Sequence, residues 1–161
     1  MIPGLLKSLA CNRGSSVKEG LKLFEVTDVM LLDATSDVGA RNERHLAVLY
    51  TGPTAGLEVL HGLLDRVMLL LEVPVRPYAW CSGGDGTNAS KFGKHGNRYF
   101  VEPTEEIPTY FPGRGANVFL EYPDRKPVVL GSMGVLHPTV LKNFDLSFPC
   151  SILEINIEAF V

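Results

Sequence analysis

The sequence predicts an α+β domain in which an antiparallel sheet is flanked by helices. Two observations support this prediction. Several apolar segments have the length of strands and are joined by turn residues, whereas only one long stretch has apolar side chains at helical spacing. The repeated strand–helix–strand order that marks a doubly wound nucleotide-binding fold is missing. At 161 residues, the chain is expected to form a single domain over residues 1–161.

The chain begins with a predicted helix and a predicted strand. Apolar side chains within residues 2–12 share one helical face, and a proline near the start is tolerated in a first helical turn. Residues 21–32 are rich in apolar and β-branched side chains. This composition predicts one strand, or two strands joined by a bend at residues 27–28.

A polar segment over residues 33–43 is predicted to be a connecting turn. It contains Arg41 and Glu43, and Arg44 follows directly, as in the polar connector of an Arg–Glu substrate site. The simpler interpretation is a solvated loop or a subunit contact. Residues 45–51 are short and apolar and are closed by Gly-Pro, which predicts a buried strand that begins after both arginines.

The clearest amphipathic helix is predicted over residues 54–72, where leucine, valine and methionine recur at intervals of three and four. Pro74 is expected to stop it. His61 and Asp65 stand four positions apart on this helix, a spacing that permits a contact. Most surface helices contain such pairs, so the pair alone predicts no catalytic site.

Residues 76–106 are predicted to contain a long insertion with the composition of a loop. The segments 75–80 and 97–102 are predicted to be the two strands of one hairpin around it. Residues 83–86 resemble part of a glycine-rich phosphate loop. The full spacing and the Lys-Ser/Thr pair are missing, which favours an ordinary loop.

The pattern becomes regular again in the last third of the chain. Residues 116–122 and 128–136 predict two strands that pair across a tight turn containing proline. Gly131 and Gly134 lie inside the second strand and predict a bulge or a close approach of two backbones.

A corner and a last strand are predicted to complete the domain. Pro138 suits the first turn of a helix that ends near Asn143, and residues 151–160 alternate as a final strand. His137 could serve as a base or a metal ligand. No neighbouring Cys, Asp or His supports either role, so the simpler interpretation is a corner residue whose ring bonds nearby backbone.

Arg114 lies between two glycines that allow a tight turn and would present its guanidinium. A guanidinium is a good partner for a carboxylate or a phosphate. The alternative is a strand-entry turn in which the arginine forms an internal salt bridge. Glu25 and Glu154 lie inside apolar segments and should be paired or solvated, so Arg114 or Arg41 is a hypothetical partner for them.

The overall composition excludes several classes of protein. A net charge of −3 argues against a phosphate-binding surface that extends over the whole domain. No run of 18 apolar residues and no secretory signal is present, so neither a membrane span nor export is expected. Cys11, Cys81 and Cys150 are odd in number and widely spaced, which fits reduced thiols in the cytosol.

Several stretches, in their order along the chain, resemble one family. They are IPGLLKSLACNR, LKLFEVTDV, DVGARNERHLAVLYTG with GLEVLHGLLDRVMLLLEV, and FPGRGANVFL followed by GVLHPTVLKNFDL and SILEINIEAF. Each stretch is short, but together they are specific. They resemble the C-terminal catalytic-like module of the β subunit of phenylalanyl-tRNA synthetase, of the eukaryotic cytosolic type. The resemblance covers nearly the whole chain except about residues 76–106.

This resemblance implies a class II aminoacyl-tRNA synthetase fold in a cytoplasmic α2β2 enzyme. The enzyme attaches phenylalanine to tRNA(Phe) with ATP and Mg²⁺, and its α subunit carries the active site. The β-subunit module has lost the catalytic residues and packs on the α subunit, here through residues 54–72 and nearby sheet edges. The resemblance therefore implies no catalytic, cofactor-binding or metal-binding residue in this chain. Arg41, Arg44, Arg114 and His137 are candidates for structural or interface roles.

The sequence departs from a working class II site in its arginines. Such a site needs one arginine after an antiparallel strand and another late in the chain. Arg41 and Arg44 are predicted to precede their strand, and residues 151–161 contain no arginine. Two alternatives are a nucleic-acid or small-ligand binding module that uses Arg114 and the long loop, and a working enzyme with an adenylate site.

The resemblance also implies that a first strand and a long helix of the module lie upstream of Met1, and that Val161 is close to the natural end. Apolar faces that those segments or the α subunit normally cover would then be open. We therefore expect this chain alone to self-associate or to be marginally stable.

Overall fold

A computed structural model describes residues 1–12, 20–76 and 96–160 of the chain. Six strands form one antiparallel sheet in the order β1-β2-β6-β5-β4-β3. The strands are β1 (Leu21–Leu32), β2 (Ala40–Thr51), β3 (Arg98–Pro103), β4 (Tyr110–Tyr122), β5 (Arg125–Leu136) and β6 (Cys150–Asn156). The helices are α1 (Ile2–Cys11), α2 (Leu57–Leu70), α3 (Pro138–Asn143) and the short 3₁₀ helix η2 (Glu158–Phe160). The predicted α+β class and antiparallel sheet are confirmed.

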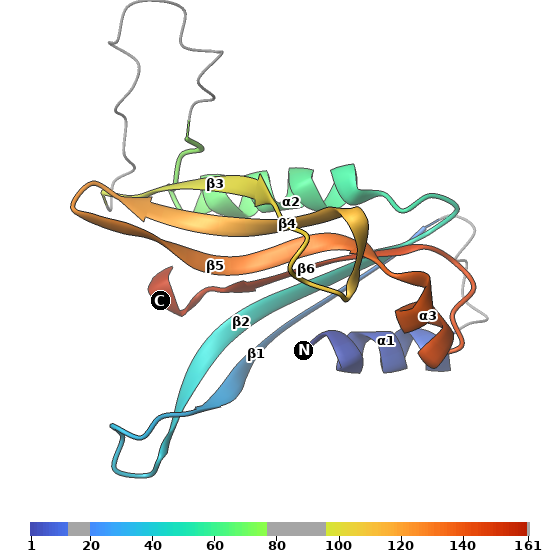
Figure 1. Ribbon diagram of the computed structural model, residues 1–161, viewed down its shortest axis with the longest axis horizontal. Coiled ribbons are helices and arrows are strands. Elements are labelled where there is room, and N and C mark those ends of the chain that lie inside the picture. Colours follow the sequence, from blue (N-terminus) through green and yellow to red (C-terminus); the bar gives the residue numbers. More distant parts are fainter. Residues whose placement is uncertain (13–19, 77–95, 161) are drawn as a thin grey trace, which may run out of the picture.

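The sheet is the middle layer of three (Figure 1). Helix α2 covers one face, and α1 and α3 cover the other. Because side chains alternate along a strand, β2 serves both cores. Its Val48 packs towards α2, whereas its Ala47 and Leu49 pack towards α1. All three of these side chains are buried, which places β2 and its neighbour β6 at the centre of the domain.

Two glycines allow the close approach that the sequence predicts in β5. A Cβ atom at Gly131 would overlap the carbonyl oxygen of Glu154 on β6, and the β4–β5 register shifts beside this position. A Cβ atom at Gly134 would lie 2.7 Å from the ring of Tyr110. The same Cβ atom would lie 2.8 Å from the carbonyl oxygen of Arg114 on β4, so a close approach of two backbones is confirmed at both glycines.

Strand β1 runs without interruption past residues 27–28, which confirms the first of the two predicted alternatives. Two boundaries differ from the prediction. Strand β4 begins at Tyr110, before the Pro-Gly-Arg-Gly segment, instead of at residue 116. Helix α2 begins at Leu57 because Gly56 adopts a left-handed conformation (φ 60°) beneath the ring of Tyr50, where a Cβ atom would not fit.

The predicted hairpin around the long insertion is wrong in its direction. Val75 forms a single bridge with Tyr99 of β3, and that bridge is parallel. Residues 98–103 form an edge strand of the sheet, although they lie inside the range 76–106 that the sequence sets apart. Residues 77–95, with Cys81 and the glycine-rich 83–86, lie outside the described residues.

None of the helices in the described ranges is long and apolar enough to cross a membrane.

Candidate functional site

Arg41 and Arg44 lie within β2, so the prediction that both precede a strand is wrong. Each guanidinium has a carboxylate partner. Nη2 of Arg41 lies 2.7 Å from Oε1 of Glu43, and Nε of Arg44 donates to Oδ1 of Asp28 on β1 over 2.8 Å. The pairing with Arg44 lowers the pKa of Asp28, and the pKa of Arg44 is raised in turn. Arg44 therefore joins β1 to β2, whereas Arg41 pairs with Glu43 along its own strand.

A polar cluster that the sequence did not reveal joins β2 to β6 on the face that carries α1. Nδ1 of His45 lies 3.3 Å from Oε1 of Glu154, and Nδ2 of Asn156 donates to Oε2 of Glu43 over 2.7 Å. These four side chains come from facing positions of the two strands, which pair His45 with Asn156. The alternation Arg41, Glu43, His45 along β2 is the one sequence signal that places them on a common face.

The second ring nitrogen of His45 is poorly satisfied. Its Nε2 is buried and lies 3.5 Å from Oε2 of Glu43, which is within ion-pair distance but outside good hydrogen-bond geometry. A neutral imidazole has only one N–H to donate, and Nδ1 faces Glu154. The cluster links two central strands through His45 with Glu154 and Asn156 with Glu43, while Nε2 of His45 has no hydrogen-bond partner among the described residues.

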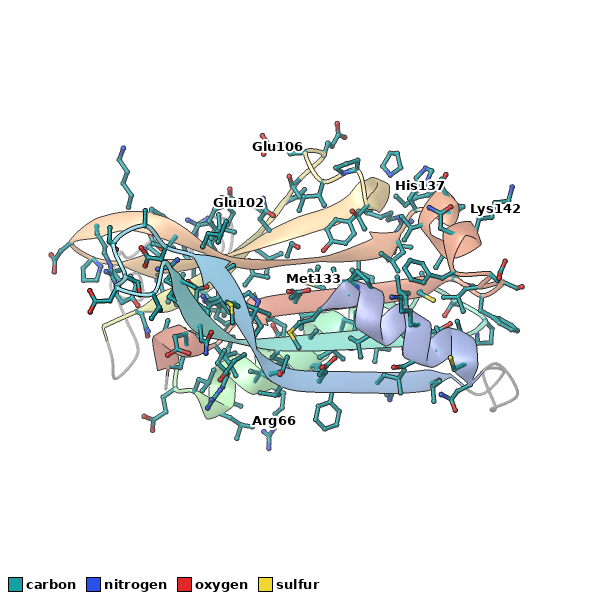
Figure 2. The ribbon with its side chains drawn as sticks, turned by 90° about the horizontal axis from the view of Figure 1, so that it is seen from below. Arg66, Glu102, Glu106, Met133, His137 and Lys142 are labelled. Carbon is teal, nitrogen blue, oxygen red and sulfur yellow. The ribbon has the colours of Figure 1, made fainter. Side chains whose placement is uncertain are left out.

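His137 lies at the corner between β5 and α3 (Figure 2). Its Nδ1 accepts a hydrogen bond from the backbone N–H of Thr139 over 3.2 Å, which caps the first turn of α3. The ring also stacks near Phe111, with ring centroids 6.2 Å apart. The ring thus bonds nearby backbone, as a corner residue is expected to do, and Nδ1 is used in this bond.

Arg114 lies inside β4, where the predicted tight turn is instead a register shift between Tyr110 and Gly115, and the neighbouring Gly113 has a φ of 70°. Its side chain is exposed. No ion pair joins it to another described residue, so the predicted internal salt bridge is not found there. Neither Arg114 nor Arg41 partners Glu154, because His45 does.

Asp65 on helix α2 bonds to Tyr99 instead of to His61, the contact that their spacing permits. The hydroxyl of Tyr99, on β3, donates to Oδ1 of Asp65 over 2.7 Å. Tyr99 is buried, so this bond fixes the helix to the far edge of the sheet. A contact between residues 34 positions apart could not be read from helical spacing.

An apolar groove of about 550 Å³ runs between β1 and α2. Its lining is shared by β1, β2 and α2: Lys22, Leu23, Phe24, Val26, Leu46, Val48, Val59, Leu60, Leu63 and Val67. Phe24 is 75% exposed and Val26 is 50% exposed, although both are large and apolar. The groove exists because α2 packs on β2, β5 and β6 and leaves the edge strand β1 uncovered on that face.

The described residues hold no cluster of His, Cys, Asp or Glu with the geometry to bind a metal. Cys150 is buried, which raises the pKa of its thiol, whereas Cys11 is exposed. The arginines of β2 are paired, and β6 contains no arginine. This set of residues does not fit ATP with Mg²⁺, and we derive no chemical step through them.

The arrangement thus combines a polar cluster between two central strands with an open apolar groove, and comparison with known proteins identifies its family. Residues 1–157 match the profile described as "Phenylalanyl tRNA synthetase beta chain CLM domain". The chain belongs to this family of phenylalanyl-tRNA synthetase beta-chain domains.

The relatives of this CLM domain cover its full length. It is 48% identical over 161 residues to the phenylalanine–tRNA ligase beta subunit of Drosophila melanogaster and 40% identical to that of Homo sapiens. It is 39% identical to a protein of Arabidopsis thaliana named "Phenylalanine--tRNA ligase beta subunit, cytoplasmic". In each case the whole chain is matched, and it spans 23–24% of the relative's length.

Proposed function

We propose that this chain is a non-catalytic module of the β subunit of a cytoplasmic, eukaryotic-type phenylalanyl-tRNA synthetase. In this proposal it packs on the α subunit and supports the ATP- and Mg²⁺-dependent aminoacylation of tRNA(Phe) by an α2β2 enzyme. The family match and the names of the relatives support the parent enzyme. The antiparallel sheet flanked by helices supports a single catalytic-like domain of the class II type over residues 1–161.

The pairing of the arginines supports a non-catalytic role. A guanidinium that binds a substrate phosphate must have donors available to it. Arg41 and Arg44 use theirs on Glu43 and Asp28 within the same hairpin. We propose structural roles for these two arginines and for His137, and an interface role for Arg114, whose side chain is exposed.

The apolar groove between β1 and α2 is the observation that carries the association with the α subunit. A helix is about 10 Å wide and strands lie about 4.8 Å apart, so one helix covers about two strands of a sheet. Helix α2 lies over the central strands and leaves β1 open. A second helix placed beside α2 would bury Phe24 and Val26 together with Leu63, which is 36% exposed on α2.

The test is assembly of the intact protein with the α subunit after Leu63→Asp. A charge buried in an apolar contact costs several kcal/mol unless it is paired, so we expect the heteromer to dissociate at concentrations where the unchanged protein assembles. The dissociation constant is measured by analytical ultracentrifugation, and thermal unfolding checks that the variant is folded.

The matched control is Leu69→Asp on the same helix. Leu69 is 65% exposed and lies outside the groove, so assembly should persist. If Leu63→Asp assembles as well as Leu69→Asp, the groove is not the contact. If the unchanged protein does not bind the α subunit at all, the proposed function itself is wrong.

A further inference from the structure

The β1–β2 hairpin extends beyond the rest of the domain as an arm, which we define as residues 28–44 (Figure 1). Strand β2 pairs with β6 only from His45 to Thr51. Beyond His45, each strand of the arm has the other as its only strand partner within residues 1–12, 20–76 and 96–160. A two-stranded ribbon without a core is marginally stable in water, so an arm of this kind needs other support.

The root of the arm is tied to the end of β6. The backbone N–H of Ile157 donates to the carbonyl oxygen of Arg44 over 2.8 Å, and the N–H of Arg44 donates to Oε2 of Glu158 over 3.0 Å. The two hydrogen bonds from the guanidinium of Arg44 to Asp28, at 2.8 and 3.3 Å, then join the two strands just beyond the root. These hydrogen bonds fix the orientation of the arm relative to β6.

The tip of the arm has a defined shape as well. The backbone N–H and the hydroxyl of Thr35 both donate to Oδ1 of Asp33, and the N–H of Asp33 donates to the carbonyl of Gly39 over 3.0 Å. Gly39 has a φ of 71°, which suits a glycine in a tight turn. A tip ordered before binding loses little conformational freedom when it meets a partner.

Three large apolar side chains of the arm are highly exposed, beside polar side chains such as that of Asp37. Leu32 is 97% exposed, Val38 is 82% exposed and Met30 is 76% exposed, and these are the three highest values for large apolar residues within the described ranges. Large apolar side chains this exposed, close together in one hairpin, are typical of an interaction surface. Exposed apolar side chains lower the solubility of a protein, so we expect a partner to cover those of the arm in the assembled enzyme.

The net charge of the arm indicates which class of partner it can bind. Its acidic residues are Asp28, Asp33, Asp37 and Glu43, and its basic residues are Arg41 and Arg44, which leaves a net charge of −2. Nucleic acid is disfavoured, because a phosphate backbone is bound by cationic surfaces. The favoured partner is a protein with an apolar pocket and a cationic rim.

We propose that the arm inserts Leu32 and Val38 into such a pocket on the α subunit, as a contact separate from the groove. This inference rests on the proposed function, because it takes the α subunit as the partner. The groove binds along α2 and β1, whereas the arm reaches past the sheet and engages the same partner at a second place. Two separate contacts fix the relative orientation of two subunits more firmly than the groove contact alone.

The first test is Leu32→Ser together with Val38→Ser in the intact protein, assembled with the α subunit. Because both side chains are exposed, the domain should fold normally. We expect the dissociation constant to rise at least about tenfold, since burial of two anchors is lost. The matched control is Val128→Ser with Val129→Ser on β5, where exposures are 52% and 57%. It should change the constant less than about twofold.

The second test places a photo-crosslinking benzoylphenylalanine at position 38. A crosslink to the α subunit supports the proposal. A crosslink to tRNA, to a second copy of this chain or to another part of the β subunit overturns it, as does a product with no crosslinked partner. If the arm variant assembles normally while Leu63→Asp does not, the arm proposal fails and the proposed function stands.

Discussion

Gly131 on β5 lies directly against the backbone carbonyl of Glu154 on β6, with no room for a Cβ atom between them. The neighbouring strand can therefore approach only a glycine. The contact lies within the central part of the sheet, where neighbouring strands keep the backbone from moving away. The same β6 residue that faces this glycine through its backbone also holds His45 through its side chain.

Gly131→Ala is expected to lower the free energy of unfolding by about 3 kcal/mol, because strand β6 must move to admit a methyl group. Urea unfolding followed by circular dichroism measures this change. Gly62→Ala is the control, because no atom lies within 4 Å of a Cβ at that exposed position of α2. Alanine favours a helix there and should raise stability by about 1 kcal/mol. Equal stabilities for the two variants would contradict the packing at Gly131.

Tyr99→Phe should lower the free energy of unfolding by about 1 kcal/mol, because Asp65 loses its hydrogen bond from the Tyr99 hydroxyl. The measurement is a double-mutant cycle with Asp65→Ala in urea unfolding. A coupling energy of about 1 kcal/mol is expected for the pair. Strictly additive effects would show that α2 is held to β3 by packing alone.

His137→Ala removes the side-chain cap of α3 and should cost about 1 kcal/mol in the free energy of unfolding. His137→Asn supplies another side-chain acceptor at the same position and should restore most of that loss. Thermal unfolding of both variants measures how much stability each one loses. If asparagine is no better than alanine, the ring matters for its stacking against Phe111 rather than for the cap.

The arm should loosen in acid because of Asp28. Its hydrogen bonds from Arg44 lower the pKa of Asp28 below the usual 3.8. The unfolded chain then binds the proton more readily than the folded chain. The stabilisation is therefore present above the unfolded pKa and is lost as the pH falls through the folded value. Hydrogen exchange of the arm amides from neutral pH to about pH 2 measures this loss.

Asp28→Asn should make the exchange of the arm amides less dependent on pH in that range, because no carboxylate remains to be protonated against Arg44. Asp37→Asn, at an exposed position in the turn of the same arm, provides the matched control and should leave the acid dependence in place. If the amide exchange of the arm depends on pH as strongly in Asp28→Asn as in the unchanged protein, another titrating group causes the loosening of the arm in acid.

The sequence predicts the central strands and helices well because their burial produces a pattern. Helix α2 and strand β5 are examples, and Gly131 and Gly134 also reveal a close backbone approach. The sequence predicts the β1 side of the arm as strand, but residues 40–44 of β2 resemble a loop, because Arg41 and Arg44 lie where that strand has no buried face. A strand that pairs only with its neighbour in a ribbon carries no alternating signal of burial.

The interior contacts could not be predicted from the sequence for a different reason. His45 and Glu154 are 109 positions apart, and only the register of β2 with β6 brings them together. The parallel bridge of Val75 to Tyr99 likewise depends on where the chain re-enters the sheet. The groove appears only once it is known that α2 leaves β1 uncovered.

The strand order has a consequence for how the domain is made. The hairpin of β1 with β2 and the meander of β3, β4 and β5 each pair neighbours in the sequence, so each half can form early. In the part of the chain that the structure describes, β6 alone lies between the two halves, and it follows the other five strands in the sequence. During synthesis β2 and β5 therefore each keep one edge unpaired until residues 150–156 have been made. Until then, these two edges can pair with other chains.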